Sequence, residues 1–165
     1  MASENLRIAM VNLHSTETRL HNKFDPLIPN QRLQGQFKIG AIESELKTVI
    51  NEKDEKQRFV RFYVETMMRY VKEPVSKEAQ EDEELFSNQL ASSIKAKFVA
   101  EYTIVNDMDI PEESLAEFGK YNVPHNIWPY WREYCQSTCS RMALPVIVIP
   151  LLQMPPDGFE KKPEN

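Results

Sequence analysis

The strongest pattern in the sequence lies in RFVRFYVETMMRYVK, residues 58–72. From Val60 onward the even-numbered positions are largely apolar, whereas odd-numbered positions carry charged residues such as Arg61 and Glu65. This period of two predicts a β-strand with one buried face. The same alternation in IKAKFVAEYTI, residues 94–104, predicts a second long strand that runs antiparallel to the first.

Two more strands are expected earlier in the chain. In residues 36–50 the apolar positions change phase beside Gly40, as they do where a β-bulge inserts an extra residue. Alternation in residues 6–10 indicates a first strand, and the segment around Pro26 and Pro29 interrupts pairing before the next one. The economical count is therefore four consecutive strands.

The segment between the two long strands, residues 73–91, contains Pro74 and the acidic run Glu81-Asp82-Glu83-Glu84. Four adjacent acids cannot pack in a core, so we expect an exposed loop or a short helix there. The run either steers a basic partner to the surface or is simply a solvated loop.

After the strands the apolar period lengthens to that of a helix. Pro111 and the two acids that follow it predict the start of a short helix that ends near Gly119 or Tyr121. A longer amphipathic helix is expected to open at about Pro129 and to run towards Met142, with apolar residues at spacings of three and four.

Pro145 is expected to stop the long helix. The apolar run VIVIPLL, residues 146–152, is extended by composition, and the polar tail, residues 155–165, is expected to be disordered. Residues 1–154 then form a single domain. Because strands come first and helices last, we expect the α+β class, with an antiparallel sheet.

Composition narrows the function classes. The chain has 165 residues, of which 41% are hydrophobic and 27% charged, and this fits one soluble domain. A formal charge of -5 argues against nucleic acid as a partner, because that affinity rests on clustered Lys and Arg. The four glycines lie too far apart for a phosphate-binding loop, which disfavours a nucleotide enzyme. No apolar stretch reaches the ~18–20 residues of a membrane span and no signal-peptide pattern is present, so we expect no membrane insertion and a cytoplasmic location.

The thiols and imidazoles do not suggest a metal site. Cys135 and Cys139 lie four residues apart in the expected long helix, where disulfide geometry is poor, so we expect free thiols. Together with His14, His21 and His125 they form no zinc-binding spacing. No catalytic constellation can be argued from the spacing of residues, so we expect no enzyme, no metal and no cofactor.

A resemblance to a known family rests on NIWPYWREYCQSTCSRMALPVIVIPLL, residues 126–152. An aromatic-Pro-Tyr start, an Arg-Glu pair, a Ser/Thr-rich middle, a basic residue and a Pro-containing extended ending resemble the signature of SecB export chaperones. The strand FVAEYTIV, residues 98–105, and the connector to Tyr121 lie where that family has its fourth strand and connector. Two features depart from the family: Met142 replaces a glycine at the helix end, and no terminal helix follows the extended segment.

The resemblance implies a SecB-like fold, a four-stranded antiparallel sheet with C-terminal helices packed on one face, and a homotetramer built as a dimer of dimers. It also implies an ATP-independent chaperone, or holdase, that binds unfolded or precursor polypeptides and passes them to the SecA motor for export. Some SecB-like proteins instead guard an antitoxin of a toxin-antitoxin system. The chain is therefore expected to be either a general holdase or a module dedicated to one partner.

A holdase needs accessible apolar and aromatic surface, and the C-terminal third supplies the candidates. We expect Trp128 and Tyr130 to be more exposed than their neighbours, because they lie off the apolar stripe of the helix. The alternative is that these side chains only cover the sheet. The predicted client-binding residues are Phe118, Tyr121, Ile127, Trp128, Tyr130, Trp131, Tyr134, Met142, Leu144, Val146, Val148 and Leu151.

Overall fold

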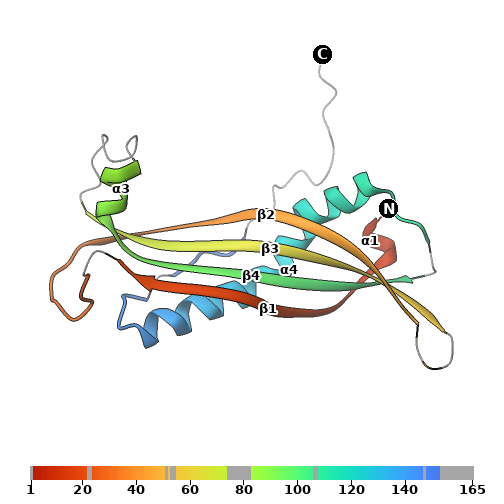
Figure 1. Ribbon diagram of the computed structural model, residues 1–165, viewed down its shortest axis with the longest axis horizontal. Coiled ribbons are helices and arrows are strands. Elements are labelled where there is room, and N and C mark those ends of the chain that lie inside the picture. The colour runs from red at the N-terminus through yellow and green to blue at the C-terminus, as the bar shows by residue number, and fades with distance from the viewer. Residues whose placement is uncertain are drawn as a thin grey trace, which may run out of the picture.

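The computed structural model describes residues 2–21, 24–50, 52, 55–73, 83–105, 108–146 and 148–152. Within these ranges the elements are α1 (Ala2–Asn5), β1 (Leu6–Leu20), β2 (Leu33–Ile50), β3 (Lys56–Lys72), α3 (Glu83–Gln89), β4 (Leu90–Ile104) and α4 (Glu112–Arg141). The four strands form one antiparallel sheet in the order β1-β4-β3-β2 (Figure 1). This confirms the expected α+β class and the count of four strands.

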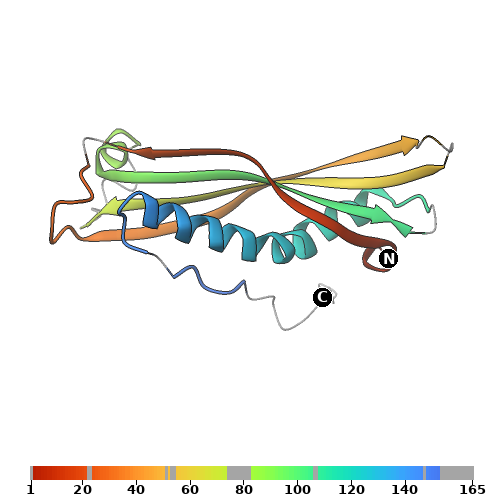
Figure 2. The same cartoon turned by 90° about the horizontal axis from the view of Figure 1, so that it is seen from below.

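The molecule has two layers. The strands are long and strongly twisted, and α4 crosses one side of the sheet; on the other side the described residues form no helix of comparable length (Figures 1 and 2). We call these two sides the helix face and the open face. β4 and β3 occupy the middle of the sheet, so β1 and β2 are its edge strands.

The alternation in the two central strands places their apolar residues on the helix face. Val60, Phe62 and Val64 of β3 are almost fully buried, as are Phe98 and Tyr102 of β4. The strands pair in register, with Phe62 opposite Ala100, so these residues meet in one layer beneath α4. The prediction of two strands, each with one buried face, is therefore confirmed.

The edge strands are irregular. In β2 the pairing with β3 shifts between Ile39 and Ile42, which confirms the bulge expected beside Gly40. In β1 the pairing with β4 shifts twice, between Ile8 and Met10 and again beyond Leu13. A bulge bends its strand and increases the local twist, which fits the curved sheet in Figure 2.

A single helix of 30 residues replaces the two helices expected from the sequence. Pro124 and Pro129 both lie inside α4, where each removes one backbone donor at a cost of about 3 kcal/mol. Burial of Val123, Ile127 and other side chains against the sheet offsets that cost, at roughly 1.5–3 kcal/mol for each large residue. The two-helix prediction is wrong because tertiary packing outweighs the local preference of proline.

α4 ends in a Schellman motif. Leu144 donates its amide to the carbonyl of Cys139 at 2.9 Å, and Ala143 donates to Ser140 at 3.3 Å. Ala143 has the left-handed φ of 54° that glycine normally adopts at this position. The helix ends at Arg141, four residues before Pro145, so the expectation that Pro145 stops it is wrong: the Schellman motif ends the helix first.

The segment between β3 and β4 contains the short helix that was one of the two expected alternatives. Within α3, Phe86 lies under the guanidinium of Arg69, 4.2 Å from its Cζ, and this contact holds the helix at the end of the sheet. The first two residues of the acidic run, 81 and 82, and the tail at 155–165 lie outside the described residues. Among the described residues, no helix combines the length and the apolar character that crossing a membrane requires.

Candidate polypeptide-binding surface

The twelve predicted client-binding residues fall into two groups. Those on α4 point mostly into the core, whereas most of those after the helix are exposed. The buried residues are Phe118, Ile127, Trp128, Trp131 and Leu144; Tyr121, Tyr134 and Met142 are partly buried; Tyr130, Val146, Val148 and Leu151 are exposed. In the isolated chain the buried five can meet a partner only if a neighbouring segment moves.

Trp128 differs most from its expected position. Tyr130 is half exposed as predicted, but only 5% of Trp128 is accessible, so the expectation of an exposed Trp128 is wrong. Its ring packs edge-on against Phe37 of β2, with ring centroids 6.0 Å apart. Its indole Nε1 donates a hydrogen bond to the carbonyl of Pro150 at 2.7 Å. The residue is covered because the chain beyond α4 folds back over it.

Residues 148–152, which we call the C-terminal strap, return along α4. Arg132 Nε donates to the carbonyl of Ile149 at 2.8 Å, next to the Trp128–Pro150 bond. Ile149 is fully buried, while Val148 and Leu151 are 77% and 71% exposed. The strap therefore buries Ile149 fully and Leu152 partly, and presents Val148 and Leu151 to solvent.

A pocket of about 350 Å³ opens at the end of the molecule where β1 passes into β2. One wall is the connection between these strands and the other is the turn after α4. The lining residues are Phe24, Pro26, Ile28, Asn30, Gln31, Leu33, Ala143, Leu144 and Pro145. We call this the end pocket. Most of the lining residues are apolar, backbone and amide groups add polar surface, and the pocket has the size of a site for a few side chains of a ligand.

Short-range hydrogen bonds shape the β1–β2 connection, of which residues 24–32 are described. Asp25 Oδ1 accepts a hydrogen bond from the amide of Leu27 at 2.9 Å, and Gln31 Nε2 donates to the carbonyls of Asp25 and Ile28 at 2.6 and 2.9 Å. These bonds form a compact turn that leaves Leu27 78% exposed. The apolar residues at the rim are therefore presented by a defined loop.

Two contacts join this region to the rest of the fold. The Tyr70 hydroxyl donates a hydrogen bond to the carbonyl of Pro145, which places the turn after α4 beside β3. The amide of Glu73 donates to the carbonyl of Arg32 at 3.0 Å and fixes the far end of the connection. Both walls of the end pocket are thus anchored on the sheet.

Sequence reasoning named only Leu144 among the residues that line the end pocket. The segment FDPLIPN, residues 24–30, was interpreted only as an interruption of pairing. A signal was present, because Leu27 and Ile28 form an apolar pair between Pro26 and Pro29, and a loop that is merely solvated has no need of such a pair.

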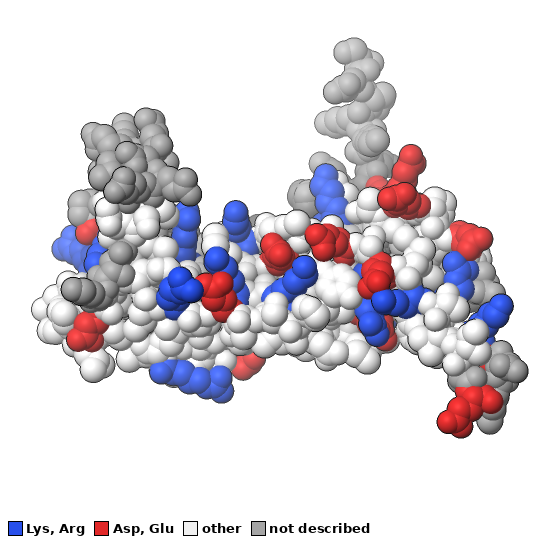
Figure 3. All heavy atoms as spheres, viewed as in Figure 1, with Lys and Arg blue, Asp and Glu red and all other residues white. Residues whose placement is uncertain are grey.

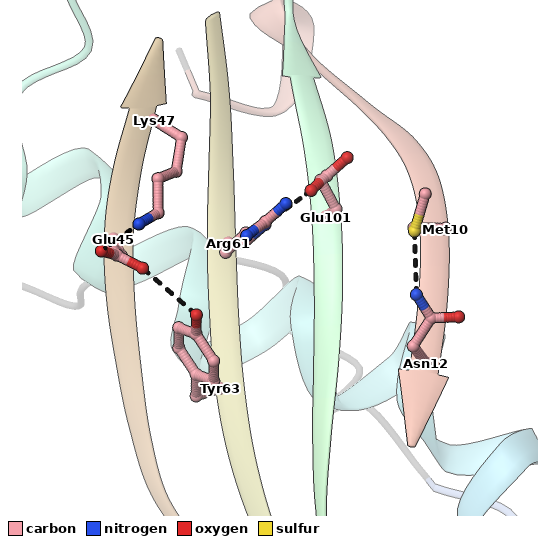
Figure 4. Close-up of polar contacts among 7 residues, drawn as sticks. All are labelled: Met10, Asn12, Glu45, Lys47, Arg61, Tyr63 and Glu101. Carbon is pink, nitrogen blue, oxygen red and sulfur yellow. Dashed lines mark hydrogen bonds and ion pairs between the residues drawn. The ribbon is translucent and has the colours of Figure 1, made fainter. Parts of the chain in front are cut away.

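The open face has a different character. Lys, Arg, Asp and Glu side chains of both signs lie among one another across its centre (Figure 3). Arg61 Nε pairs with Glu101 Oε2 at 2.6 Å, and the hydroxyl of Tyr63 donates to Glu45 at 3.1 Å (Figure 4). The bond with Glu101 raises the pKa of Arg61. A face whose charges are paired within the chain is poorly suited to bind apolar polypeptide.

One histidine lies where β1 leads into the β1–β2 connection. His21 directly follows β1, and its Nε2 lies 2.8 Å from Oγ of Ser93 in β4. Partial burial, followed by the nearby charges of Arg19 and Lys95, lowers the pKa of His21. Cys135 and Cys139 are buried free thiols on α4, and burial raises the pKa of Cys135. Neither thiol is placed to act on a ligand at the surface.

Comparison with known proteins adds one finding. No protein-family model matches the sequence, and a search of curated proteins finds no match. Among solved structures, the SecB-like chaperone Rv1957 of Mycobacterium tuberculosis, in complex with a ChAD peptide from the Rv1956 HigA1 antitoxin, is similar with a TM-score of 0.67 and 18% identity. The alignment covers 93% of this chain and 95% of that chain. This likeness confirms the expected SecB-like fold.

Proposed function

We propose that this protein is a divergent SecB-like chaperone that binds extended or non-native polypeptides at the end pocket. The observation that carries the proposal is a pocket of about 350 Å³ lined mostly by apolar residues, among them exposed Ile28; exposed Leu27 and Val146 directly adjoin lining residues on its two walls. The SecB-like fold supports the same conclusion.

The chemistry of the pocket suits partners of varied sequence. Burying one large apolar side chain contributes roughly 1.5–3 kcal/mol and does not require a particular neighbour. Of the predicted client-binding residues, we propose that Leu144, Val146, Val148, Leu151 and Tyr130 make such contacts, because they lie in the pocket wall or on the accessible surface. The buried aromatic residues of α4 then support the site from within the core.

Assembly and cellular role follow from the resemblance. We propose a homotetramer, a cytoplasmic location and a holdase activity that keeps precursor polypeptides competent for export. The outer edges of β1 and β2 pair with no other strand within the described chain, and such edges are suited to contacts between subunits.

The test is suppression of aggregation by the parent and by the double variant Leu27→Asp/Ile28→Asp. We expect the parent to keep an unfolded, aggregation-prone polypeptide in solution, and the double variant to lose most of this effect. Val49→Asp is the matched control, since Val49 is 53% exposed at the opposite end of β2. If the end-pocket variant works as well as the parent, the proposed site is wrong.

The second candidate is a chaperone dedicated to one partner, such as an antitoxin. It is favoured by the similar SecB-like chaperone, whose structure contains a peptide from an antitoxin. The two candidates differ in breadth. A general holdase protects several unrelated unfolded proteins, whereas a dedicated module leaves them to aggregate and binds one partner tightly.

A further inference from the structure

The C-terminal strap lies on a surface formed by Phe37 of β2 and by Trp128 and Arg132 of α4, which we call the groove. The polar contacts of the strap with the groove are made by its backbone. The indole Nε1 of Trp128 and the Nε of Arg132 donate to consecutive carbonyls, those of Pro150 and Ile149. Every peptide carries such carbonyls, so neither contact depends on the side chains of the bound segment.

Two side chains of the strap add to these two bonds, Ile149 and, more weakly, Leu152, which is partly buried against the core. Ile149 is fully buried, whereas Val148 and Leu151 on either side of it face solvent. Phe37 of β2 packs edge-on against Trp128 and is itself partly accessible, so aromatic surface continues from the groove to the edge of the sheet. The groove thus combines two fixed donors with an apolar socket for Ile149.

The strap itself is held by few contacts. It belongs to none of the four strands, and within the described chain its own amides donate no hydrogen bond. Its polar attachment is limited to the two carbonyls and its apolar attachment is centred on Ile149. A segment bound in this way can be replaced by another of the same shape without breaking the sheet or α4.

We propose that this groove is a second polypeptide-binding site, which the strap occupies in the manner of a bound client. The external ligand it fits is an extended segment with a branched aliphatic residue for the socket and free carbonyls at that residue and the next. The inference rests on the proposed function, in that it assigns a second contact for the same class of partner. The strap competes for this contact and lowers the apparent affinity of the groove.

The probe is a fluorescent synthetic peptide with the sequence of residues 145–153, PVIVIPLLQ, and the readout is anisotropy with the full chain. In the parent the strap fills the groove, so binding is weak. Ile149→Asp removes the strap from its socket, and we expect the peptide to bind about tenfold more tightly. Val49→Asp is the matched control, because Val49 is exposed on β2 twelve residues along the strand from Phe37, and it leaves affinity at the parent level.

Two conservative changes test the donors in the Ile149→Asp background. Trp128→Phe keeps an aromatic ring but removes the indole N–H, and Arg132→Gln removes the guanidinium donor. Each is expected to weaken peptide binding by about fivefold. A ligand bound elsewhere on the protein is unaffected by either change.

Ile149→Ala is the milder variant if the aspartate disturbs folding, which circular dichroism detects. It is expected to give an affinity between those of the parent and a free groove. If neither Ile149 variant binds the peptide more tightly than the parent does, the strap is no competitor and the inference is wrong. Leu27→Asp/Ile28→Asp separates the two proposals, because it impairs the end pocket and leaves the gain from Ile149→Asp in place.

Discussion

Gly119 sets how closely α4 approaches the sheet, and replacing it with alanine tests that contact. A Cβ at this position would lie 3.1 and 3.2 Å from Cε1 and Cδ1 of Phe62 and 3.5 Å from Cγ2 of Ile42. Favourable carbon–carbon separations are about 3.5–4.0 Å. The ring of Phe62 has little freedom to move, because it packs against Tyr102 and Phe118 at centroid distances of 5.6 and 5.8 Å.

Two effects of opposite sign decide the outcome of Gly119→Ala. Alanine is favoured over glycine inside a helix by about 1 kcal/mol. Overpacking a tight core costs about 1–3 kcal/mol. We therefore expect a net loss of about 1 kcal/mol in the free energy of unfolding, measured by urea denaturation at a fixed protein concentration, with the fluorescence of the two buried tryptophans as the signal.

The control is the same change in a Phe62→Leu background. Leucine lacks the ring atoms that meet the new Cβ, so there Gly119→Ala is expected to stabilise the protein by up to about 1 kcal/mol. A change of sign between the two backgrounds identifies the contact with Phe62 as the cause. If the variant stabilises the parent, or costs the same in both backgrounds, the close approach of α4 to β3 is not what requires glycine.

Three further predictions concern other parts of the fold. Ala143→Gly relieves the strain of a left-handed φ at a non-glycine residue and should stabilise the protein by about 1 kcal/mol. Ala116→Gly, on the exposed side of α4, should destabilise the protein by a similar amount. Equal shifts of the melting temperature in the two variants would contradict this prediction. The pKa of His21 in the folded protein is below the ordinary 6.5, so as the pH falls the unfolded chain binds a proton before the folded chain does. The stability that neutral His21 contributes above pH 6.5 is therefore lost below that pH. His21→Asn should make the melting temperature less dependent on pH below 6.5, and an unchanged dependence would refute this prediction. Cys135 and Cys139 should resist a thiol reagent in buffer and both react in denaturant, and rapid reaction in the native protein would show that α4 does not stay packed.

The sheet could be predicted from the sequence because each of its signals is local. The period of two in β3 and β4 reflects burial on one face, which any strand between a helix and solvent must satisfy. The phase change beside Gly40 marked the bulge of β2 for the same reason. Each pattern lies within one short stretch of consecutive residues, so the strand could be predicted without considering the rest of the chain.

The helix and the site depend on contacts between distant residues, and this is why they were only partly predicted. Pro124 and Pro129 indicate a break when read locally, and only the packing of α4 on the sheet keeps the helix continuous. Trp128 is covered by Pro150 and its neighbours, 22 positions further along the chain. The walls of the end pocket are separated by more than a hundred residues. The pattern of residues within a short stretch of sequence cannot predict these contacts between distant segments.

The irregular edges of the sheet bear on a risk for any protein that binds unfolded chains, namely aggregation templated by an exposed edge strand. A long, straight edge strand offers its free backbone groups as a template on which a loose polypeptide can grow into an amyloid-like ladder. Here the pairing shifts in β1 beyond Ile8 and Leu13, and in β2 between Ile39 and Ile42, interrupt both edges. In the proposed chaperone function, a bound polypeptide would find no long uniform edge to copy, and apolar side-chain contacts would hold it without seeding its aggregation.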